Sequence, residues 1–189
     1  MLITLCQIAW TTEVQAALSS ADPTTNMANM KKLKTTYKNK VKNYVELVEK
    51  PGLPILNRMK LIALITIEEH NREIIDKLIA QKVSSVNDFL WQSQLRFAKT
   101  EDEEQTKIEI YQTNCKFDYG YEYQGNNGRL VVTPLTDRAY MTLTNALNMQ
   151  RGGAPQGPAG TGKTETVKDL GKNLAFFVVI QNCSDTMDY

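Results

Sequence analysis

A phosphate-binding signature in the last third of the chain constrains its fold more than any other feature. Residues 157–164 read Gly-Pro-Ala-Gly-Thr-Gly-Lys-Thr and satisfy the pattern G-x-x-x-x-G-K-T in full. Gly157, Gly160 and Gly162 permit backbone conformations that bulkier residues avoid, so successive amide N–H groups can turn toward one anion. The pattern therefore predicts a loop that holds phosphate.

Two side chains at the end of this loop are the candidates for nucleotide chemistry. Lys163 can reach the β and γ phosphates as a point charge, and Thr164 can offer its hydroxyl to Mg²⁺. We assign Lys163 and Thr164 as catalytic and Thr164 as the metal ligand. The whole loop is assigned as nucleotide-binding: Gly157, Pro158, Ala159, Gly160, Thr161, Gly162, Lys163 and Thr164.

The residues after the loop support this interpretation, whereas those before it do not. Residues 164–175 have Val167, Leu170 and Leu174 on one helical face, and a helix that begins at the loop favours negative charge. The apolar run 176–180 then predicts a parallel strand buried on both faces. Residues 150–156, in contrast, lack the apolar strand that usually precedes such a loop.

The first hundred residues follow helical spacing. Apolar residues recur in steps of three and four, and Pro51 and Pro54 interrupt the pattern. We predict a loop over 19–29 and a fourth helix, with N-cap oxygens at Ser84 and Ser85, that carries Phe89 and Phe97. The three longer predicted helices cover 2–19, 30–50 and about 55–80.

The pattern changes to alternation near residue 107, which indicates strands. Apolar and aromatic residues recur at every second position from 115 to 123, and 129–133 reads as another strand after a turn at 125–128. We interpret the acidic run 101–104 as a solvated turn. A boundary between a helical part and a mixed α/β part is therefore expected near residues 100–118.

Composition excludes several classes of site. The chain has 22 Lys plus Arg against 21 Asp plus Glu. This balance produces no overall positive electrostatic field that would attract nucleic acid. Its three cysteines are far apart and its one histidine, His70, cannot build a three-histidine metal centre. No apolar run reaches the roughly 18 residues of a membrane span. We expect neither a nucleic-acid nor a membrane partner.

The sequence around the loop resembles that of the dynein heavy chain family at the start of its first AAA+ module. The resemblance is carried by 130–138 (Leu-Val-Val-Thr-Pro-Leu-Thr-Asp-Arg), 152–156 (Gly-Gly-Ala-Pro-Gln) and the loop itself. Residues 119–123 resemble the beginning of the family's ring, and 10–14 resemble part of its linker. Asn182 to Asp185, with Asp188 and Tyr189, is more similar to axonemal than to cytoplasmic dyneins.

This resemblance implies the fold class and the remaining site residues. It implies an α/β fold in which 1–117 form the helical C-terminal part of the linker. Residues 118–189 would be the start of the first AAA+ ATPase module, incomplete after the P-loop helix and the next strand. By the same analogy, four residues border the adenine: Leu130, Val131, Thr133 and Leu135.

The resemblance also implies a function for the whole heavy chain. It implies an ATP-driven, minus-end-directed microtubule motor of the axoneme of cilia and flagella, with ATP or ADP and Mg²⁺ as cofactors. Its partners would be the rest of the heavy-chain ring, intermediate and light chains, and microtubules, which are bound through other regions. Past the loop there is no apolar strand ending in Asp-Glu, the element that orients the attacking water. We therefore expect a fragment that does not hydrolyse ATP alone.

Two other functions stay open on the sequence alone. One is a non-enzymatic helical interaction segment with a structural nucleotide loop. The other is a different AAA+ ATPase. ATP turnover by this chain and the sequence downstream of residue 189 would separate them from a motor fragment.

Overall fold

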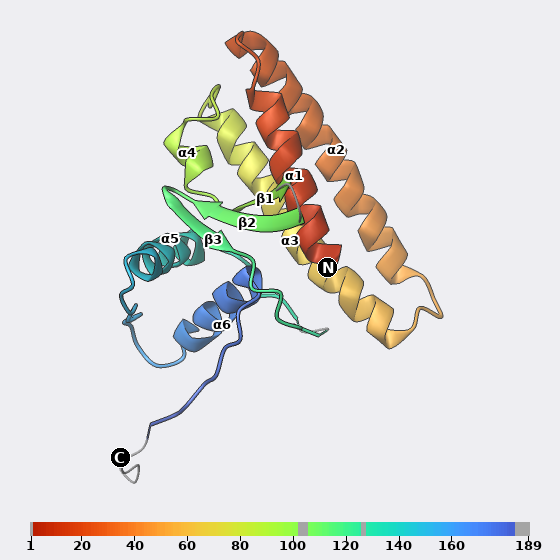
Figure 1. Cartoon of the computed structure of the whole chain (residues 1–189). Helices are drawn as coiled ribbons and strands as arrows, with labels where there is room; N and C mark the ends of the chain where they lie inside the picture. Colours follow the sequence, from red (N-terminus) through yellow and green to blue (C-terminus); the bar gives the residue numbers. More distant parts are fainter. Residues whose placement is uncertain (1, 102–105, 126–127, 184–189) are drawn as a thin grey trace.

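A helical segment comes first along the chain, and a small antiparallel sheet and further helices follow it. The computed structural model describes residues 2–101, 106–125 and 128–183 (Figure 1). Its elements are α1 (Leu2–Leu18), α2 (Pro23–Glu49), α3 (Ile55–Ala80), α4 (Phe89–Gln92), β1 (Arg96–Glu101), β2 (Thr106–Gln112), β3 (Cys115–Asp118), α5 (Pro134–Asn148) and α6 (Lys163–Leu174).

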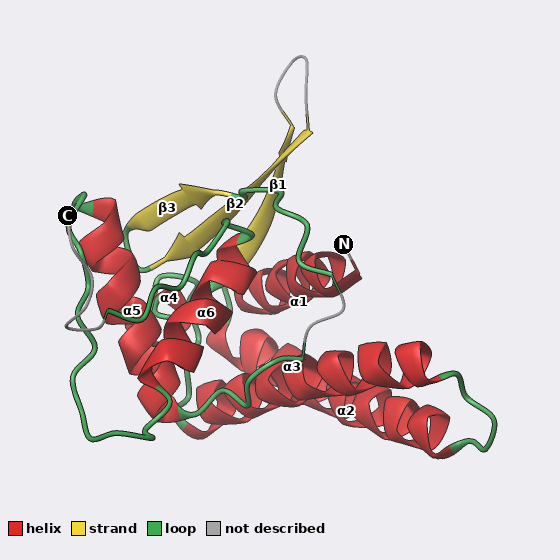
Figure 2. Ribbon diagram, turned by 90° about the horizontal axis from the view of Figure 1, so that it is seen from below, coloured by secondary structure: helices red, strands yellow, loops and turns green. Residues whose placement is uncertain are grey.

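The three long helices pack side by side around one apolar core (Figure 2). Trp10 of α1 meets Trp91 of α4 edge to face, with ring centroids 5.3 Å apart. Tyr37 of α2 and Ile75 of α3 are fully buried in the same cluster. Such aromatic pairs contribute about 0.5–1.5 kcal/mol to stability beyond the burial of their area. Because the cluster contains residues of α1, α2, α3 and α4, it joins all four helices.

The sheet lies between the long helices and the pair α5 and α6 (Figure 1). Its strands are antiparallel in the order β1-β2-β3, with Phe97 opposite Ile110 and Ile110 opposite Phe117. The amide of Phe97 donates to the Thr11 hydroxyl at 3.0 Å, which attaches β1 to α1. A second buried cluster joins the sheet to α5 and α6: Phe97, Ile110, Tyr140, Leu143, Leu170 and Leu174.

The second helix begins earlier than predicted, so the predicted loop over 19–29 is wrong in its second half. Asp22 caps α2, because its carboxylate accepts from the amides of Thr24 and Thr25, and Pro23 occupies the first helical position. Both are known helix-start signals. Five of the six α2 lysines are exposed to solvent: Lys31, Lys32, Lys34, Lys38 and Lys42.

The fourth helix is shorter than predicted. Asp88, not Ser85, provides the cap, since its carboxylate accepts from the amide of Leu90 at 2.9 Å. Phe97 belongs to β1 instead of a helix. Phe97 adopts the strand conformation because pairing with β2 satisfies the hydrogen-bonding groups of its backbone. The Phe97 ring then packs in the second core cluster.

Three predicted strand segments lie outside the strands that the structure describes. The tyrosine alternation leaves the sheet after Asp118, and Tyr121 has a φ of 54°, which a strand does not allow. Residues 129–133 and 176–180 are coil. The second run is not buried, as Phe177 and Val179 show 76% and 67% exposure. An apolar run becomes a buried strand only beside neighbouring strands, and the described residues supply none here.

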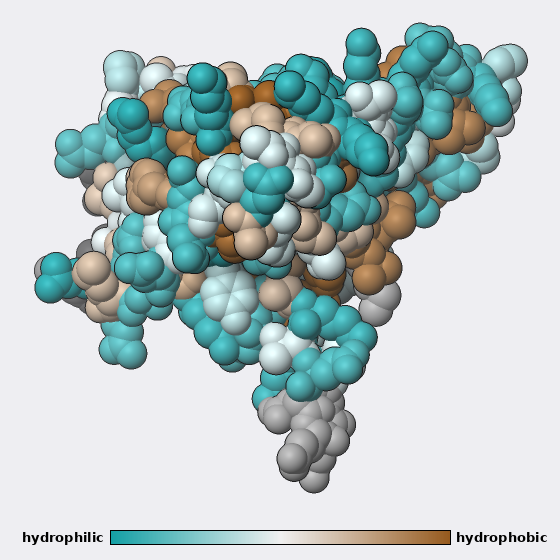
Figure 3. Space-filling model, turned by 90° about the horizontal axis from the view of Figure 1, so that it is seen from above, coloured by the Kyte–Doolittle hydropathy of each residue, from teal (hydrophilic) through white to brown (hydrophobic). Residues whose placement is uncertain are grey.

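Some predictions fall on positions outside the described residues. These include most of the acidic run 101–104, the centre of the turn 125–128, and Ser184, Asp185, Asp188 and Tyr189. None of the helices that the structure describes is both long enough and apolar enough to cross a membrane. Hydrophilic side chains cover much of the face in Figure 3, with hydrophobic ones between them.

Candidate functional site

The predicted phosphate loop is an exposed turn that leads directly into α6. Residues 157–162 are exposed, and α6 begins at Lys163. Gly160 and Gly162 have φ values of 77° and 79°, in the left-handed region that favours glycine. The glycines predicted from the sequence are therefore the residues that bend the loop, and Gly162 caps the helix without a side chain.

Lys163 turns back over the loop that precedes it. Its ammonium group donates to the carbonyl oxygens of Gly157 at 2.7 Å and Pro158 at 2.6 Å. The Thr161 hydroxyl donates to the same Pro158 carbonyl at 2.9 Å. A positive charge is thus held at the centre of the turn beside the N-terminus of a helix, where both the charge and the helix dipole attract anions.

Thr164 stands exposed in the first turn of α6. In the same turn, Glu165 pairs with Lys168 at 2.6 Å, and this contact lowers the pKa of the Glu165 carboxyl. No group of three or more His, Cys, Asp or Glu in the described part of the chain could hold a metal ion. A single hydroxyl fits Mg²⁺, which keeps several waters and is bound largely through the phosphates of its nucleotide.

The residues expected beside the adenine fall on the segment that leads into α5 and, at Leu135, on the first turn of α5 itself. Leu130 is half-buried, whereas Val131 and Leu135 are 74% and 76% exposed. Thr133 caps α5 and forms a capping box with Thr136. The four residues therefore share a segment, but only Leu130 contacts the interior.

The face of α6 differs from the prediction at one position. Leu170 and Leu174 are buried as expected, but Val167 is exposed. Asp169 lies on the buried side and is 1% exposed. Sequence reasoning missed it, because an acidic residue in a charged helix usually faces water.

Asp169 accepts hydrogen bonds from two other parts of the chain. Its Oδ2 accepts from the Tyr140 hydroxyl at 2.7 Å and from Arg129 Nη2 at 3.2 Å. The amide of Leu130 donates to its Oδ1 at 3.4 Å. Burial, and next the Asp169 charge, raise the pKa of the Tyr140 phenol. A single carboxylate thus connects the loop helix, α5 and the segment before α5.

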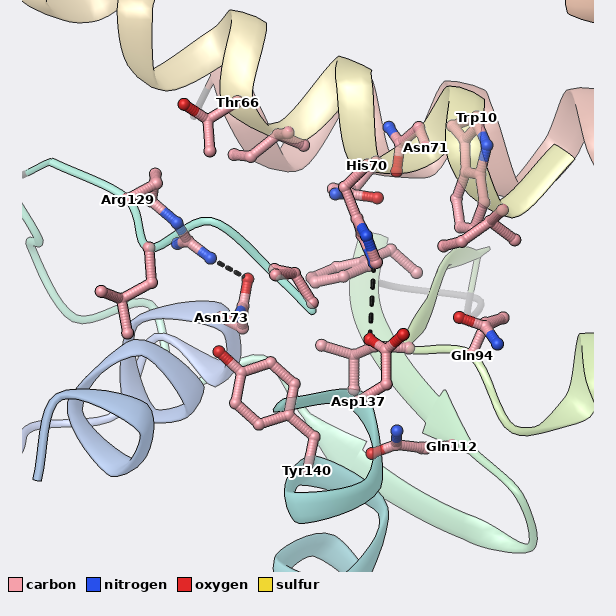
Figure 4. A pocket seen from close by; sticks show the side chains of 17 residues that line it. Trp10, Thr66, His70, Asn71, Gln94, Gln112, Arg129, Asp137, Tyr140 and Asn173 are labelled. Carbon is pink, nitrogen blue, oxygen red and sulfur yellow. Dashed lines mark hydrogen bonds and ion pairs between the residues drawn. The ribbon is translucent and has the colours of Figure 1, made fainter. Parts of the chain in front are cut away.

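A small cavity lined by both polar and apolar side chains lies between the helical part and this region (Figure 4). It measures about 40 Å³, enough for ordered water. Across it, His70 Nε2 of α3 lies 3.6 Å from Asp137 Oδ1 of α5. Burial lowers the pKa of His70 to about 4 and raises the pKa of Asp137 to about 6. Both groups are thereby shifted toward their neutral forms.

Comparison with known proteins gives a family match over this region. The family described as "Hydrolytic ATP binding site of dynein motor region" matches residues 119–189. This range contains the loop, α5, α6 and Asp169. The matched family and the loop geometry therefore indicate the same part of the chain as an ATP-binding site.

Similarity to individual proteins extends over the whole chain. It is 53% identical over all of its length to the Chlamydomonas reinhardtii protein "Dynein-1-beta heavy chain, flagellar inner arm I1 complex". Identity is 50% to the human "Dynein axonemal heavy chain 2", again over 100% of this chain, and 50% to the mouse "Dynein axonemal heavy chain 1" over 97%. The chain spans about 4% of the length of each of these relatives.

Proposed function

The chain belongs to the dynein heavy chain family, as a segment of the axonemal type, and on that premise we propose that its loop binds the ATP that drives a microtubule motor. One observation carries the proposal. The Lys163 ammonium group lies at the N-terminus of α6, 2.7 Å from the Gly157 carbonyl oxygen. An incoming triphosphate would replace the loop carbonyls as the partner of this charge.

The proposal gives each site residue a role. The backbone N–H groups of residues 157 and 159–162 surround the phosphates, Lys163 contacts the terminal phosphates, and Thr164 would hold Mg²⁺ together with them. Mg²⁺, when bound, neutralises phosphate charge. The residues proposed to border the base are Leu130, Val131, Thr133 and Leu135.

The proposal also assigns the two parts of the chain. Residues 1–117 act as the C-terminal part of a linker, and residues 118–189 as the start of an α/β AAA+ module. Contacts between these parts support a mechanical connection, because the Thr144 hydroxyl of α5 donates to Gln112 of β2 at 2.9 Å and His70 of α3 approaches Asp137 of α5. Hydrolysis draws on groups from the rest of the heavy chain, which also supplies the contacts to microtubules and to intermediate and light chains. The working location is the ciliary or flagellar axoneme.

Loss of the Lys163 charge tests the proposal. In a heavy chain that carries this segment, Lys163→Ala should weaken binding of fluorescent ATP at this site at least about tenfold, since charged hydrogen bonds contribute about 1.5–3 kcal/mol. Lys168→Ala is the matched control, because Lys168 lies on the same helix and pairs with Glu165. Equal ATP affinity in both variants would refute the proposal and favour a structural loop without nucleotide.

A further inference from the structure

We propose that Asp169 is a positioning residue that fixes the base-bordering segment against the phosphate-loop helix, an inference that rests on the proposed ATP site. In this role the carboxylate touches neither the phosphates nor the base. It sets the distance between the part of the site that grips phosphate and the part that receives the base.

The carboxylate is placed to connect both parts. Asp169 lies six residues after Lys163 on α6, which is about 9 Å along the axis of a continuous helix. At its other side, the Leu130 amide donates to Asp169 Oδ1 at 3.4 Å. The first residue of the base-bordering segment is therefore registered directly to the helix that carries Lys163.

The far end of the same segment is connected to the same carboxylate through α5. Thr133 caps α5, and Tyr140 of that helix donates its hydroxyl to Asp169 Oδ2 at 2.7 Å. Both ends of the stretch from Leu130 to Thr133 are thus connected to the Asp169 carboxylate of α6, directly at Leu130 and through α5 at Thr133. Movement of this stretch relative to the loop would break hydrogen bonds at one end or the other.

Burial and charge explain why a carboxylate performs this task. Asp169 is 1% exposed and its partner Arg129 only 9%, so their charges are compensated mainly by each other. Asn173, one turn further along α6, contacts both members of the pair. Buried ion pairs add little net stability compared with apolar packing, but they fix geometry, because a displaced partner leaves an uncompensated charge.

The expected consequence is a selective loss of base recognition. Asp169→Asn keeps the size of the side chain but removes the charge that holds Arg129. In a heavy chain that carries this segment, ATP affinity at this site should fall about tenfold, and discrimination between ATP and GTP should fall with it. Affinity for inorganic tripolyphosphate, which has no base, should stay within about twofold of the original value.

The experiment measures three ligands on four proteins. ATP, GTP and tripolyphosphate are titrated against the original chain, Asp169→Asn, Tyr140→Phe and Glu165→Gln, and the binding that persists in a Lys163→Ala background is subtracted. Tyr140→Phe removes one hydrogen bond without emptying space, so a smaller change in the same direction is expected. Glu165→Gln, on the exposed side of α6, serves as the control and should change nothing.

Each outcome decides one question. Unchanged ATP-to-GTP selectivity in folded Asp169→Asn overturns the inference, as does an equal loss of tripolyphosphate and ATP, which would indicate general damage to the helix. If Asp169→Asn fails to fold, Tyr140→Phe decides alone, and unchanged selectivity there overturns the inference. ATP binding that is insensitive to Lys163→Ala rejects the proposed site itself, a result distinct from any of these.

Discussion

The ammonium nitrogen of Lys163 lies 2.7 Å from the carbonyl oxygen of Gly157, so the first residue of α6 is hydrogen-bonded to the first residue of the turn. The contact holds the two ends of the loop together through a single ammonium group. It also means that phosphate oxygens compete with backbone carbonyls for the same donor protons.

Lys163→Arg should therefore fail to preserve nucleotide binding although it keeps the charge. A planar guanidinium cannot reproduce two contacts of 2.6 and 2.7 Å to adjacent carbonyls in a turn built around an ammonium group. We expect ATP affinity at this site to fall at least about tenfold, measured by equilibrium titration. Lys168→Arg is the control, and affinity in Lys163→Arg equal to the original would contradict the role given to the contact.

Gly160→Ala should strain the loop without any steric clash. Gly160 has a φ of 77°, and a Cβ added there meets nothing within 4 Å, so the cost is the left-handed backbone alone, about 1–2 kcal/mol. The loop should relax away from its phosphate-binding shape, and ATP affinity should fall several-fold. Gly152→Ala tests this reasoning, because its added Cβ is equally free and its φ is not positive. Equal effects of the two changes would contradict it.

The long helices and the phosphate loop could be predicted because their signals are local. A repeat of three and four residues defines α3 as Ile55–Ala80, and three glycines before Lys163 define the turn. The start of α2 was missed although Asp22 and Pro23 carry a local signal for it. Here the break expected at Asp-Pro is itself the beginning of a helix.

The features that sequence reasoning missed depend on contacts between distant residues. Asp169 and Arg129 are 40 positions apart, and nothing in either neighbourhood marks them as a buried pair. Phe177 sits in an apolar run that resembles a strand, yet a strand exists only through partners elsewhere. Positions that rely on a remote partner were therefore beyond a local pattern.

The His70 and Asp137 pair should give a stability that varies little with acid pH until one member is removed. The pKa of His70 falls from 6.5 to about 4 because of burial and Lys77, so its contribution to stability is lost as pH falls from 6.5 to 4. The pKa of Asp137 rises from 3.8 to about 6 because of burial, so its contribution is lost as pH rises from about 4 to 6. The two slopes oppose each other.

Single variants should expose each slope separately. Asp137→Asn should become less stable as the pH falls from 6.5 to 4, and His70→Gln less stable as it rises from 4 to 6, each by at most about 3 kcal/mol. Thermal unfolding at pH 4, 5, 6 and 7 measures both. Parallel pH profiles for the two variants would show that the groups do not titrate in this way.

Gly120→Ala should separate the segment after β3 from the end of α6. The Gly120 amide donates to the Leu174 carbonyl at 2.9 Å, and the Glu122 amide to the Ala175 carbonyl at 3.0 Å. A Cβ at position 120 would lie 2.4 Å from the Ala175 carbonyl oxygen, a backbone atom that cannot rotate away. We expect the free energy of unfolding to fall by about 1–3 kcal/mol, as it does when a side chain is forced into a site without room for it.

Thermal unfolding and amide exchange measure this effect together. Exchange should accelerate at Gly120 and Glu122, while the amides of α2, in the other core cluster, keep their protection. Gly128→Ala is the matched control, because a Cβ there meets nothing within 4 Å. If Gly120→Ala unfolds at the same temperature as Gly128→Ala, the close approach of this segment to α6 does not exist in solution. The segment would then be free to move independently of the phosphate-loop helix.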